Sequence, residues 1–533
     1  MGKDTFLKGA LILTVAGIVV KLIGSVNRIL LSRLLGGEGI GLYQMAYPIY
    51  LLALSISSAG IPVAISIIVA EKVALGDWRG ANRVFRLSLA MLAVTGVVFT
   101  LLLWFGAGWL IDQHFVRDPR AYYAIAALAP AIFFVTVLSS YRGYFQGLQM
   151  MTPTAISQII EQLFRVVTMI LLAYLLLPSG IEFAAAGASF GAGPGAAAGL
   201  LVLLYFYWRQ RPGFQEKMDS QPALRQEPGV TIISRIIRLA LPVSLANIML
   251  PVVSNIDLLI VPARLEVAGY TVEQSTELFG YLTGMAVPLV NMATILTASL
   301  AASLVPAVSE AFTLRNQQQV YQRTATAMRI SNLITIPSFV GMWLLATPIS
   351  LMLYGTPNAG TSIAIMSMGI FLLGIHQVTT GVLQGLGHTA IPVINMVISA
   401  SVKVVLSWVL TAMPSLAIKG AAWATNADFG VAALLNMYFV YRYVGFALDM
   451  KDTLRTTLAA AMMGGAVLLT YHEMMDLLRN NTIATLIAIA IGGGVYGLVL
   501  LVTGGVTGRD IERIPRVGRQ LAALLRSLRL LRG

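Results

Sequence analysis

The chain has 533 residues, of which 57% are hydrophobic and 11% are charged, and its mean hydropathy is +0.80. Soluble proteins carry roughly 25% charged residues, so this composition excludes a soluble enzyme or a soluble nucleic-acid-binding protein. The 36 Lys and Arg outnumber the 23 Asp and Glu, giving a net charge of +13, and the lack of cysteine excludes disulfides and thiolate metal sites.

Long hydrophobic runs, broken at charges, Pro and Gly, predict an all-α polytopic membrane protein with fourteen transmembrane helices. In chain order the predicted spans are 7–35, 40–70, 84–111, 121–145, 154–177, 182–208, 232–261, 276–305, 325–354, 361–386, 390–413, 416–443, 455–475 and 482–506. The first run extends to Leu35 and carries charges, so we expect a retained helix rather than a cleaved signal peptide.

Basic residues are distributed unevenly between the two sides of this topology. The N-terminus, the loops after even-numbered spans and the C-terminal tail hold 26 Lys and Arg, and the opposite loops hold only six. Cytoplasmic loops are enriched in Lys and Arg, so we expect a multi-pass protein of the cell membrane with both termini in the cytoplasm.

The sequence repeats itself at an offset of about 231 to 240 residues. Gly143–Leu148 recurs as Gly381–Leu386, and Tyr205–Arg209 recurs as Tyr438–Arg442. Six spans separate the copies, which predicts two parallel, pseudo-symmetric six-helix lobes, as in transporters that rock around a central site. The predicted divisions are an N-lobe (1–210), a linker (211–231), a C-lobe (232–445), two extra helices (446–506) and a basic amphipathic tail (507–533).

Two further features of the sequence concern movement and membrane attachment. Pro48 and Pro288 occupy matched positions in the two halves and are hinge or kink candidates. The tail from Arg509 alternates arginine with leucine, a pattern that favours binding to the anionic cytoplasmic leaflet. No GxxxxGK[ST] motif occurs, so we do not expect direct drive by ATP.

Seven charged side chains are predicted inside spans, where each costs several kcal/mol unless it faces water or a partner. They are Lys21, Arg28, Arg165, Lys403, Glu161, Asp257 and Asp428. Lys21 and Arg28 are two helical turns apart and point from one face, while Arg165 and Lys403 are equivalent positions of the repeat. A cleft carrying these four cations would bind an anionic head group, such as phosphate or pyrophosphate.

The same charges also allow internal ion pairs. Glu161 and Arg165 are spaced i, i+4, and further possible pairs are Arg28 with Asp257 and Lys403 with Asp428. Alternatively, Asp257, Asp428 and Asn426 form a cation site for coupling to Na⁺ or H⁺, which Lys403 could itself fill as a tethered cation. We expect no other cofactor and no bound metal.

Several motifs resemble the stage V sporulation protein B group, which belongs to the multidrug/oligosaccharidyl-lipid/polysaccharide (MOP) exporter superfamily beside the MurJ-type flippases. These motifs are Thr5-Phe-Leu-Lys-Gly9, Val26-Asn27-Arg28, Gly36-Gly-Glu38-Gly39-Ile-Gly41, Gly60-Ile-Pro62, Arg142-Gly143-Tyr-Phe-Gln146-Gly147 and Gln158-Ile-Ile-Glu161-Gln162. The resemblance implies two lobes in a V around a central cavity and transfer of an undecaprenyl-pyrophosphate-linked sugar across the membrane.

The resemblance also implies site residues on the first helix. Lys21 matches a basic residue of the MurJ-type flippases, whereas Asn27-Arg28 stands where those proteins tend to carry Arg-Asp. We therefore count Asn27 and Glu161 together with the four cations among the expected head-group contacts. The helix 2 arginine of those flippases has no counterpart between Leu51 and Gly60, so we expect the contacts to differ there.

Taken together, these features predict a non-enzymatic, alternating-access flippase that exports a lipid II-like peptidoglycan precursor for cell-wall or spore-cortex synthesis. Its expected partners are the lipid-linked anionic saccharide and membrane lipids, with no nucleic acid, and we expect a monomer. One alternative is a drug/cation antiporter of the same superfamily. The other is a membrane glycosyltransferase or polymerase, for which the longest loop offers only Glu216, Asp219 and Glu227.

Overall fold

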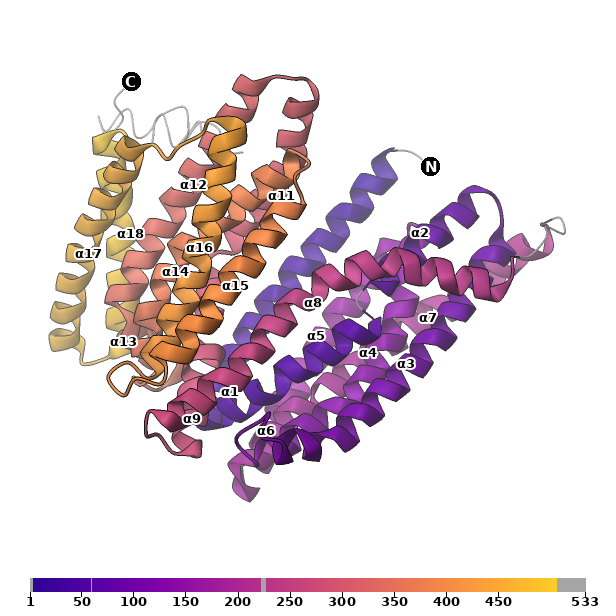
Figure 1. The fold of residues 1–533 in the computed structure, drawn as a ribbon, viewed down its shortest axis with the longest axis horizontal. Coiled ribbons are helices and arrows are strands. Elements are labelled where there is room, and N and C mark those ends of the chain that lie inside the picture. The colour runs from indigo at the N-terminus through magenta and orange to yellow at the C-terminus, as the bar shows by residue number, and fades with distance from the viewer. Residues whose placement is uncertain (1–2, 59, 222–226, 506–533) are drawn as a thin grey trace. The chain divides into compact units, whose positions relative to one another are not determined.

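The structure is a computed structural model that describes residues 3–58, 60–221 and 227–505, with side chains from residue 12 onward except those of residues 246 and 250. Every regular element in these ranges is helical, which confirms the predicted all-α class (Figure 1). The basic tail, 507–533, lies outside the described residues.

The number of membrane-spanning helices is lower than predicted. Eleven helices of the described ranges are long and apolar enough to cross a membrane, or twelve if the bent pair Gln317–Leu344 and Ala346–Tyr354 is one span. The count of fourteen is not confirmed. One reason is that Ile12–Ala74, a run of 63 residues, counts once although its helix breaks at Gly36 and the run covers two predicted spans.

A second reason for the lower count is the polar helix α16 (Ile418–Val444). Its 27 residues are long enough to span, but Asn426, Asp428 and Asn436 lower its hydropathy. Polar side chains in a membrane helix are placed where they face the interior of the protein, so hydropathy alone underestimates such helices.

The chain divides into two compact units, Met1–Glu266 with Tyr270–Gly280 and Val267–Gly269 with Tyr281–Gly533. The helices of unit 1 are α1 (Lys3–Ser58), α2 (Ile61–Ala74), α3 (Trp78–Asp112), α4 (Ala121–Gly147), α5 (Met151–Leu176), α6 (Ile181–Phe190), α7 (Ala192–Asp219), α8 (Gly229–Val267) and α9 (Val272–Phe279). A short 3-10 turn, Leu177–Ser179, connects α5 to α6. Figure 1 shows α3, α4 and α7 packed side by side in unit 1.

Two elements of unit 1 extend beyond the predicted N-lobe. Helix α7 continues to Asp219, inside the segment predicted as a linker. Helix α8, expected to open the C-lobe, contributes Ile232, Ile236 and Ala240 to the hydrophobic core around Phe85. Apolar side chains at i, i+4 and i+8 form one stripe, and that stripe is covered by unit 1.

Helix α9 is held on unit 1 by small residues and by one buried carboxylate. At Gly41 of α1 there is no room for a Cβ beside the carbonyl group of Thr276. Asp118 accepts hydrogen bonds from Thr276 Oγ1 (2.8 Å) and from Arg120 Nε (3.0 Å) and Nη2 (2.8 Å). Arg120 donates hydrogen bonds to Asp118 and to Glu38. These bonds outweigh the effect of burial and raise the pKa of Arg120 above its ordinary value.

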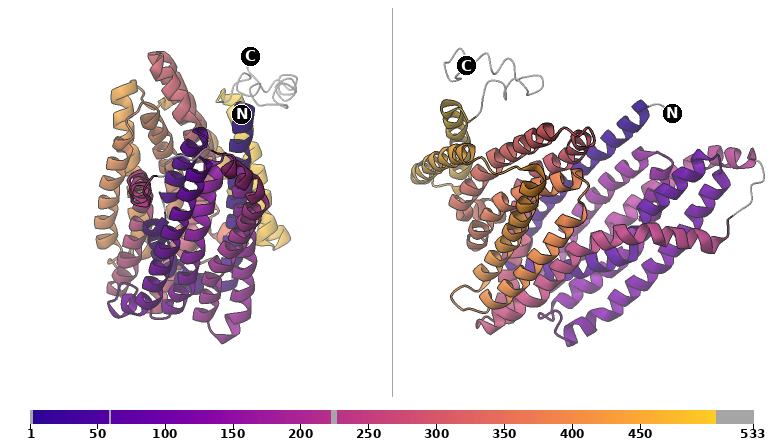
Figure 2. Two further views of the ribbon diagram at one scale, coloured as in Figure 1. Left: turned by 90° about the vertical axis from the view of Figure 1, so that its right-hand side faces the viewer. Right: turned by 45° about the horizontal axis from the view of Figure 1, so that its top comes forward.

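The helices of unit 2 begin after the π-helical segment Gly280–Ala286. They are α10 (Val287–Ala293), α11 (Ile295–Thr313), α12 (Gln317–Leu344), α13 (Ala346–Tyr354), α14 (Gly360–Gly385), α15 (Ala390–Leu410), α16, α17 (Met450–Leu478) and α18 (Asn481–Thr503). Helices α17 and α18 pack side by side (Figure 1), are drawn in yellow at the end of the chain in Figure 2, and correspond to the predicted extra helices.

Equivalent glycine contacts in the two units match the sequence repeat. A Cβ on Gly143 would lie 2.7 Å from the carbonyl oxygen of Pro62, and one on Gly381 would lie 2.7 Å from that of Ala301. These are the same positions of the repeat, at offsets of 238 and 239 residues. Each glycine lets two helix backbones approach closely, so the two units share this packing.

The two predicted hinge prolines lie in different surroundings. Pro48 lies inside the run of α1, and its carbonyl oxygen accepts a hydrogen bond from Asn255 Nδ2 (2.8 Å). The break in α1 is instead at Gly36, whose φ of 66° and ψ of −168° are not helical. Pro288 is in the first turn of α10, directly after the π-helical segment, where a proline breaks no hydrogen bond. A hinge role for either residue stays a prediction.

Candidate functional site

Unit 1 contains a buried cluster of two arginines around one carboxylate. Glu161 of α5 contacts Arg165 Nη2 through Oε1 (2.7 Å) and Arg142 Nη2 of α4 through Oε2 (2.8 Å). Arg142 Nε also donates to Ser157 Oγ (3.1 Å). The three charged side chains are only 14–19% exposed. The predicted ion pair between Glu161 and Arg165 is therefore formed. Arg142 shares the same carboxylate, so the cluster has one positive charge in excess.

Sequence reasoning missed Arg142. It lies three residues before the end of the predicted span 121–145 and is counted there with the loop residues, whereas α4 continues to Gly147. The signal that could have found it is the spacing on α4, where the small residues Gly143 and Gly147 mark the face that packs on α2. A charge one residue from such a face needs a buried partner, which Glu161 supplies.

Helix α1 packs against α5 at the level of this cluster. A Cβ on Gly24 would lie 3.3 Å from Nε2 of Gln162, and Asn27 Nδ2 lies 3.5 Å from the sulfur of Met169. Arg165 lies between Gln162 and Met169 on α5, so the stretch from Gly24 to Asn27 runs beside it. The predicted residues of the first helix and Arg165 are thus brought into one region of unit 1.

The predicted site residues on α1 differ in exposure. Lys21 is exposed, Arg28 is half-buried, and Asn27 is 7% exposed with no hydrogen-bond partner for its Oδ1. Lys21 belongs to the segment Ile12–Ala74, which is apolar enough to cross a membrane. An exposed lysine at the centre of a membrane span costs about 2.5–3.5 kcal/mol against lipid, so a hydrated surface around Lys21 stays a prediction.

The predicted charges of the second half lie in unit 2, on neighbouring helices. Lys403 of α15 is 6% exposed, unlike Lys21, and therefore lies in the interior of unit 2. One turn earlier on α15, Ser399 Oγ donates to Asp428 Oδ1 of α16 (2.6 Å). Asn426 is buried, and its Nδ2 donates to the carbonyl oxygen of Ile365 (2.7 Å). Asp257 belongs to unit 1, where it is half-buried on α8.

A network of neutral polar side chains extends this region of unit 2, and sequence reasoning missed it. Asn395 Nδ2 donates to Asn436 Oδ1 (2.8 Å). Asn436 Nδ2 in turn contacts Thr380 Oγ1 (2.9 Å) and His376 Nδ1 (3.3 Å) on α14. The sequence does not indicate this network, because a single uncharged Asn is tolerated in an apolar helix when it finds a hydrogen-bond partner.

Two of the predicted ion pairs stay predictions. Arg28 with Asp257 and Lys403 with Asp428 are compatible with the helices that carry them, but the contacts above do not decide either pair. Among the described residues, no group of three or more His, Asp or Glu side chains is placed to hold a metal ion.

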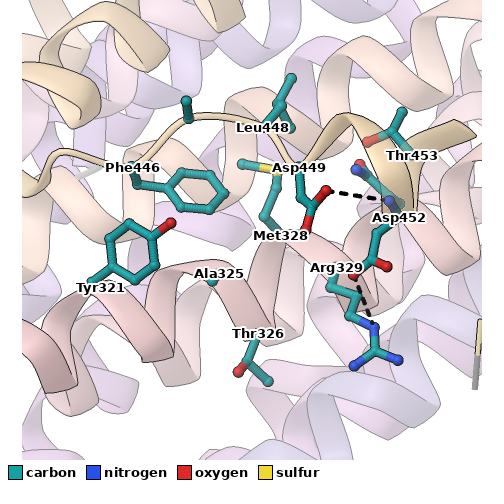
Figure 3. Close-up of a pocket in the computed structure, with 12 residues that line it drawn as sticks. Tyr321, Ala325, Thr326, Met328, Arg329, Phe446, Leu448, Asp449, Asp452 and Thr453 are labelled. Carbon is teal, nitrogen blue, oxygen red and sulfur yellow. Dashed lines mark hydrogen bonds and ion pairs between the residues drawn. The ribbon is translucent and has the colours of Figure 1, made fainter. Parts of the chain in front are cut away.

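Unit 2 also contains a cavity of about 300 Å³ that sequence reasoning did not predict (Figure 3). It lies between α12 and the start of α17, with Tyr321, Phe446 and Arg329 among its lining residues. Arg329 Nε is 3.7 Å from Asp452 Oδ2, and its Nη2 donates to the carbonyl oxygen of Gly505 (2.8 Å). The charged side chain of Arg329 therefore connects α12 to the extra helices.

Comparison with known proteins identifies similar sequences over the whole chain. A profile of the polysaccharide biosynthesis protein family matches residues 6–312, and a profile described as lipid II flippase MurJ matches residues 285–488. Stage V sporulation protein B of Bacillus subtilis (strain 168) is 31% identical over 97% of this chain and 99% of that protein. Lipid II flippase MurJ of the same organism is 27% identical over 96% of this chain and 98% of that protein.

Solved structures show the same fold at lower identity. A lipid II flippase MurJ in an inward closed conformation has a TM-score of 0.69 at 16% identity, covering 94% of this chain and all of that one. An inward-facing MATE family multidrug transporter of the MOP superfamily has a TM-score of 0.68 at 16% identity, covering 80% of this chain and 94% of that one. These likenesses concern the fold alone.

Proposed function

Because the chain belongs to the polysaccharide biosynthesis protein family, in the stage V sporulation protein B group of the MOP superfamily, we propose that it is a lipid-linked saccharide flippase. It moves an undecaprenyl-pyrophosphate-linked saccharide from the inner to the outer leaflet by alternating access. It performs no covalent chemistry, so its work is to bind the polar head group and carry it through the hydrocarbon layer.

The observation that supports this proposal is the excess of cations on α1 and neighbouring helices of unit 1. Arg142 and Arg165 share Glu161 as their paired carboxylate, and Lys21 and Arg28 lie on α1, which packs against α5. A pyrophosphate carries the charge that would balance the excess, and guanidinium groups bind its oxygens with two parallel hydrogen bonds. Lys21, which is exposed, makes the first contact, and Asn27 and Arg28 both lie about two turns further along α1.

The proposed setting is supported by the family and, for the orientation, by the distribution of Lys and Arg between the loops. We place the protein in the cell membrane with both termini in the cytoplasm, where it supplies a lipid II-like precursor for cell-wall or spore-cortex synthesis as a monomer. The chain contains no cysteine, so single cysteines introduced near each terminus and treated with an impermeant thiol reagent test this orientation directly.

The experiment is reconstitution into proteoliposomes with lipid II in the inner leaflet and an assay that detects only head groups in the outer leaflet. We expect Lys21→Glu to abolish transfer and Lys21→Arg to retain it, because the contact needs a positive charge. Lys451→Glu, an exposed position at the start of α17, is the matched control and should leave transfer unchanged.

Each possible outcome bears on the assignment. Full transfer by Lys21→Glu, with the protein folded, rejects the proposed head-group contact. Failure of the unmodified protein to transfer lipid II, together with efflux of a lipophilic cationic dye, supports the drug/cation antiporter. Elongation of the saccharide instead of transfer supports the membrane glycosyltransferase or polymerase.

A further inference from the structure

The cavity between α12 and the start of α17 is formed by one helix face and one loop. Its lining from α12 includes four side chains spaced by three or four residues, which places them on one face: Tyr321, Ala325, Met328 and Asn332. The loop 446–449, between α16 and α17, crosses over this face (Figure 3). All of these residues belong to unit 2, and a volume of about 300 Å³ is enough for a small polar group.

Two hydrogen-bond acceptors in this lining can accept further bonds. Asn332 is 6% exposed, and its Oδ1 has no hydrogen-bond partner within the described ranges. Asp449 caps the first turn of α17, where its Oδ1 accepts from the backbone N–H groups of Lys451 (2.9 Å) and Asp452 (3.4 Å). This cap uses one of the two carboxylate oxygens. Because a buried acceptor without a donor is costly, a ligand that donates hydrogen bonds would be stabilised here.

The cavity is surrounded by charges of both signs. Asp452 is shared by two guanidinium groups, because Arg329 Nε and Arg455 Nη1 each lie 3.7 Å from one of its carboxylate oxygens. Asp449 lies beside Asp452 in Figure 3, and among the described side chains no Lys or Arg forms an ion pair with it. A zwitterionic ligand matches this pattern, whereas a purely anionic ligand would be repelled by Asp449.

The cavity lies where a candidate membrane helix begins. Helix α17 is long and apolar enough to span a membrane, and Thr453 of its first turn lines the cavity. Leu454, Leu458 and Met462 follow at i, i+4 and i+8, and all three are exposed. An exposed apolar stripe that starts beside a polar cavity suits a phospholipid, because acyl chains lie along the helix while the head group lies at its end. Tyr321, also exposed, adds an aromatic ring at this level.

We propose that this cavity binds the head group of a phospholipid that carries a primary ammonium group, such as phosphatidylethanolamine. The ammonium group donates hydrogen bonds to Asn332 Oδ1 and to the carboxylate of Asp449. The phosphodiester lies on the side of Arg329 and Arg455. A quaternary ammonium group, as in phosphatidylcholine, has no N–H to donate, so the site discriminates between the two lipids. This binding does not depend on the proposed flippase function.

Binding is measured by native mass spectrometry of the delipidated full chain in detergent, with phosphatidylethanolamine and phosphatidylcholine that carry the same dihexanoyl chains. The ethanolamine lipid should bind about tenfold more tightly or better, because the choline lipid leaves the acceptors without a charged donor. Asp449→Asn should lower the affinity for the ethanolamine lipid to that for the choline lipid. The helix cap is kept in this variant, because asparagine caps as well as aspartate. Asp476→Asn, at an exposed position of the same helix, is the matched control and should bind normally.

Asn332→Leu separates a ligand contact from a structural role. If Asn332 only held helices together, its replacement by leucine would lower the thermal unfolding midpoint, because a buried hydrogen bond would be lost. We expect the midpoint in lipid-free detergent to be unchanged. The ethanolamine lipid should raise the midpoint of the unmodified protein but not that of Asn332→Leu, because a ligand that binds the folded state stabilises it.

Four results overturn the proposal. Equal binding of the two lipids rejects the ammonium contact, and full binding by Asp449→Asn rejects the role of its charge. Phosphoethanolamine without acyl chains that binds as tightly as the dihexanoyl lipid rejects a lipid as the source of the head group. Binding that appears only after removal of residues 507–533 assigns the cavity to arginines of the chain's own C-terminal tail instead. Should Asn332→Leu fail to fold, Asp449→Asn and its control still decide the outcome.

Discussion

Removing the charge of Glu161 is the sharpest test of the cluster in unit 1. In Glu161→Gln the side chain keeps its shape and one hydrogen-bond acceptor, but Arg142 and Arg165 lose the charge that lies 2.8 and 2.7 Å from their Nη2 atoms. Two guanidinium groups would then remain buried against each other. We therefore expect a large loss of folding stability rather than a small one.

The magnitude follows from the burial of the three side chains. Removing one partner of a buried ion pair costs about 3–5 kcal/mol, because the remaining charge is left unpaired. The partners here are 17% and 19% exposed, so partial hydration favours the lower end, about 3 kcal/mol. Arg142 keeps its hydrogen bond to Ser157, which limits the loss further. Adding Arg165→Gln removes one of the unpaired charges and should restore part of the stability.

The assay is reversible unfolding in mixed micelles, in which a denaturing detergent is titrated into a mild one and helix content is followed by circular dichroism. Glu473→Gln, at an exposed position of α17, is the control. A loss in Glu161→Gln within about 0.5 kcal/mol, the usual range of surface substitutions, would show that the cluster is hydrated and that the argument from burial is wrong. Additive losses in the double variant would refute the coupling between Glu161 and Arg165.

Three further predictions concern packing, a buried acid and pH. Gly420→Ala should cost about 1–3 kcal/mol in the same titration, because its Cβ meets Leu410, whereas Gly430→Ala on the same helix, with its nearest atom 3.6 Å away, should be tolerated. Asp118→Asn should cost about 2 kcal/mol and increase proteolysis of the segment before α4, because Asp118 accepts bonds from Thr276 and Arg120, while Asp112→Asn at an exposed position should not. Burial acts to raise the pKa of Asp77, but hydrogen bonds from Gly80 and Gln221 and the charge of Lys72 outweigh it and hold the pKa below its ordinary value. Its contribution to stability is therefore complete above about pH 4 and lost as the pH falls further, so Asp77→Asn should weaken the protein at neutral pH and reduce its sensitivity to acid.

The sequence alone determined the class of the protein and the positions that matter most. Runs of apolar residues longer than a bilayer needs leave no alternative to membrane helices, and the cost of a charge in lipid singles out Lys21, Glu161, Arg165, Lys403 and Asp428 without any structure. The repeat is also visible in the sequence, because equal packing at Gly143 and Gly381 demands the same small residue twice.

Which side chain meets which was decided only by the tertiary structure. Arg142, three residues before a predicted span end, contacts Glu161 because α4 and α5 lie side by side there, and no local pattern contains the distance between two helices. The network from Asn395 through Asn436 to His376 is likewise formed by residues from three helices. Periodicity and hydropathy describe how one helix meets its surroundings, whereas a buried charge or amide is stabilised by a partner far away in sequence, which only packing selects.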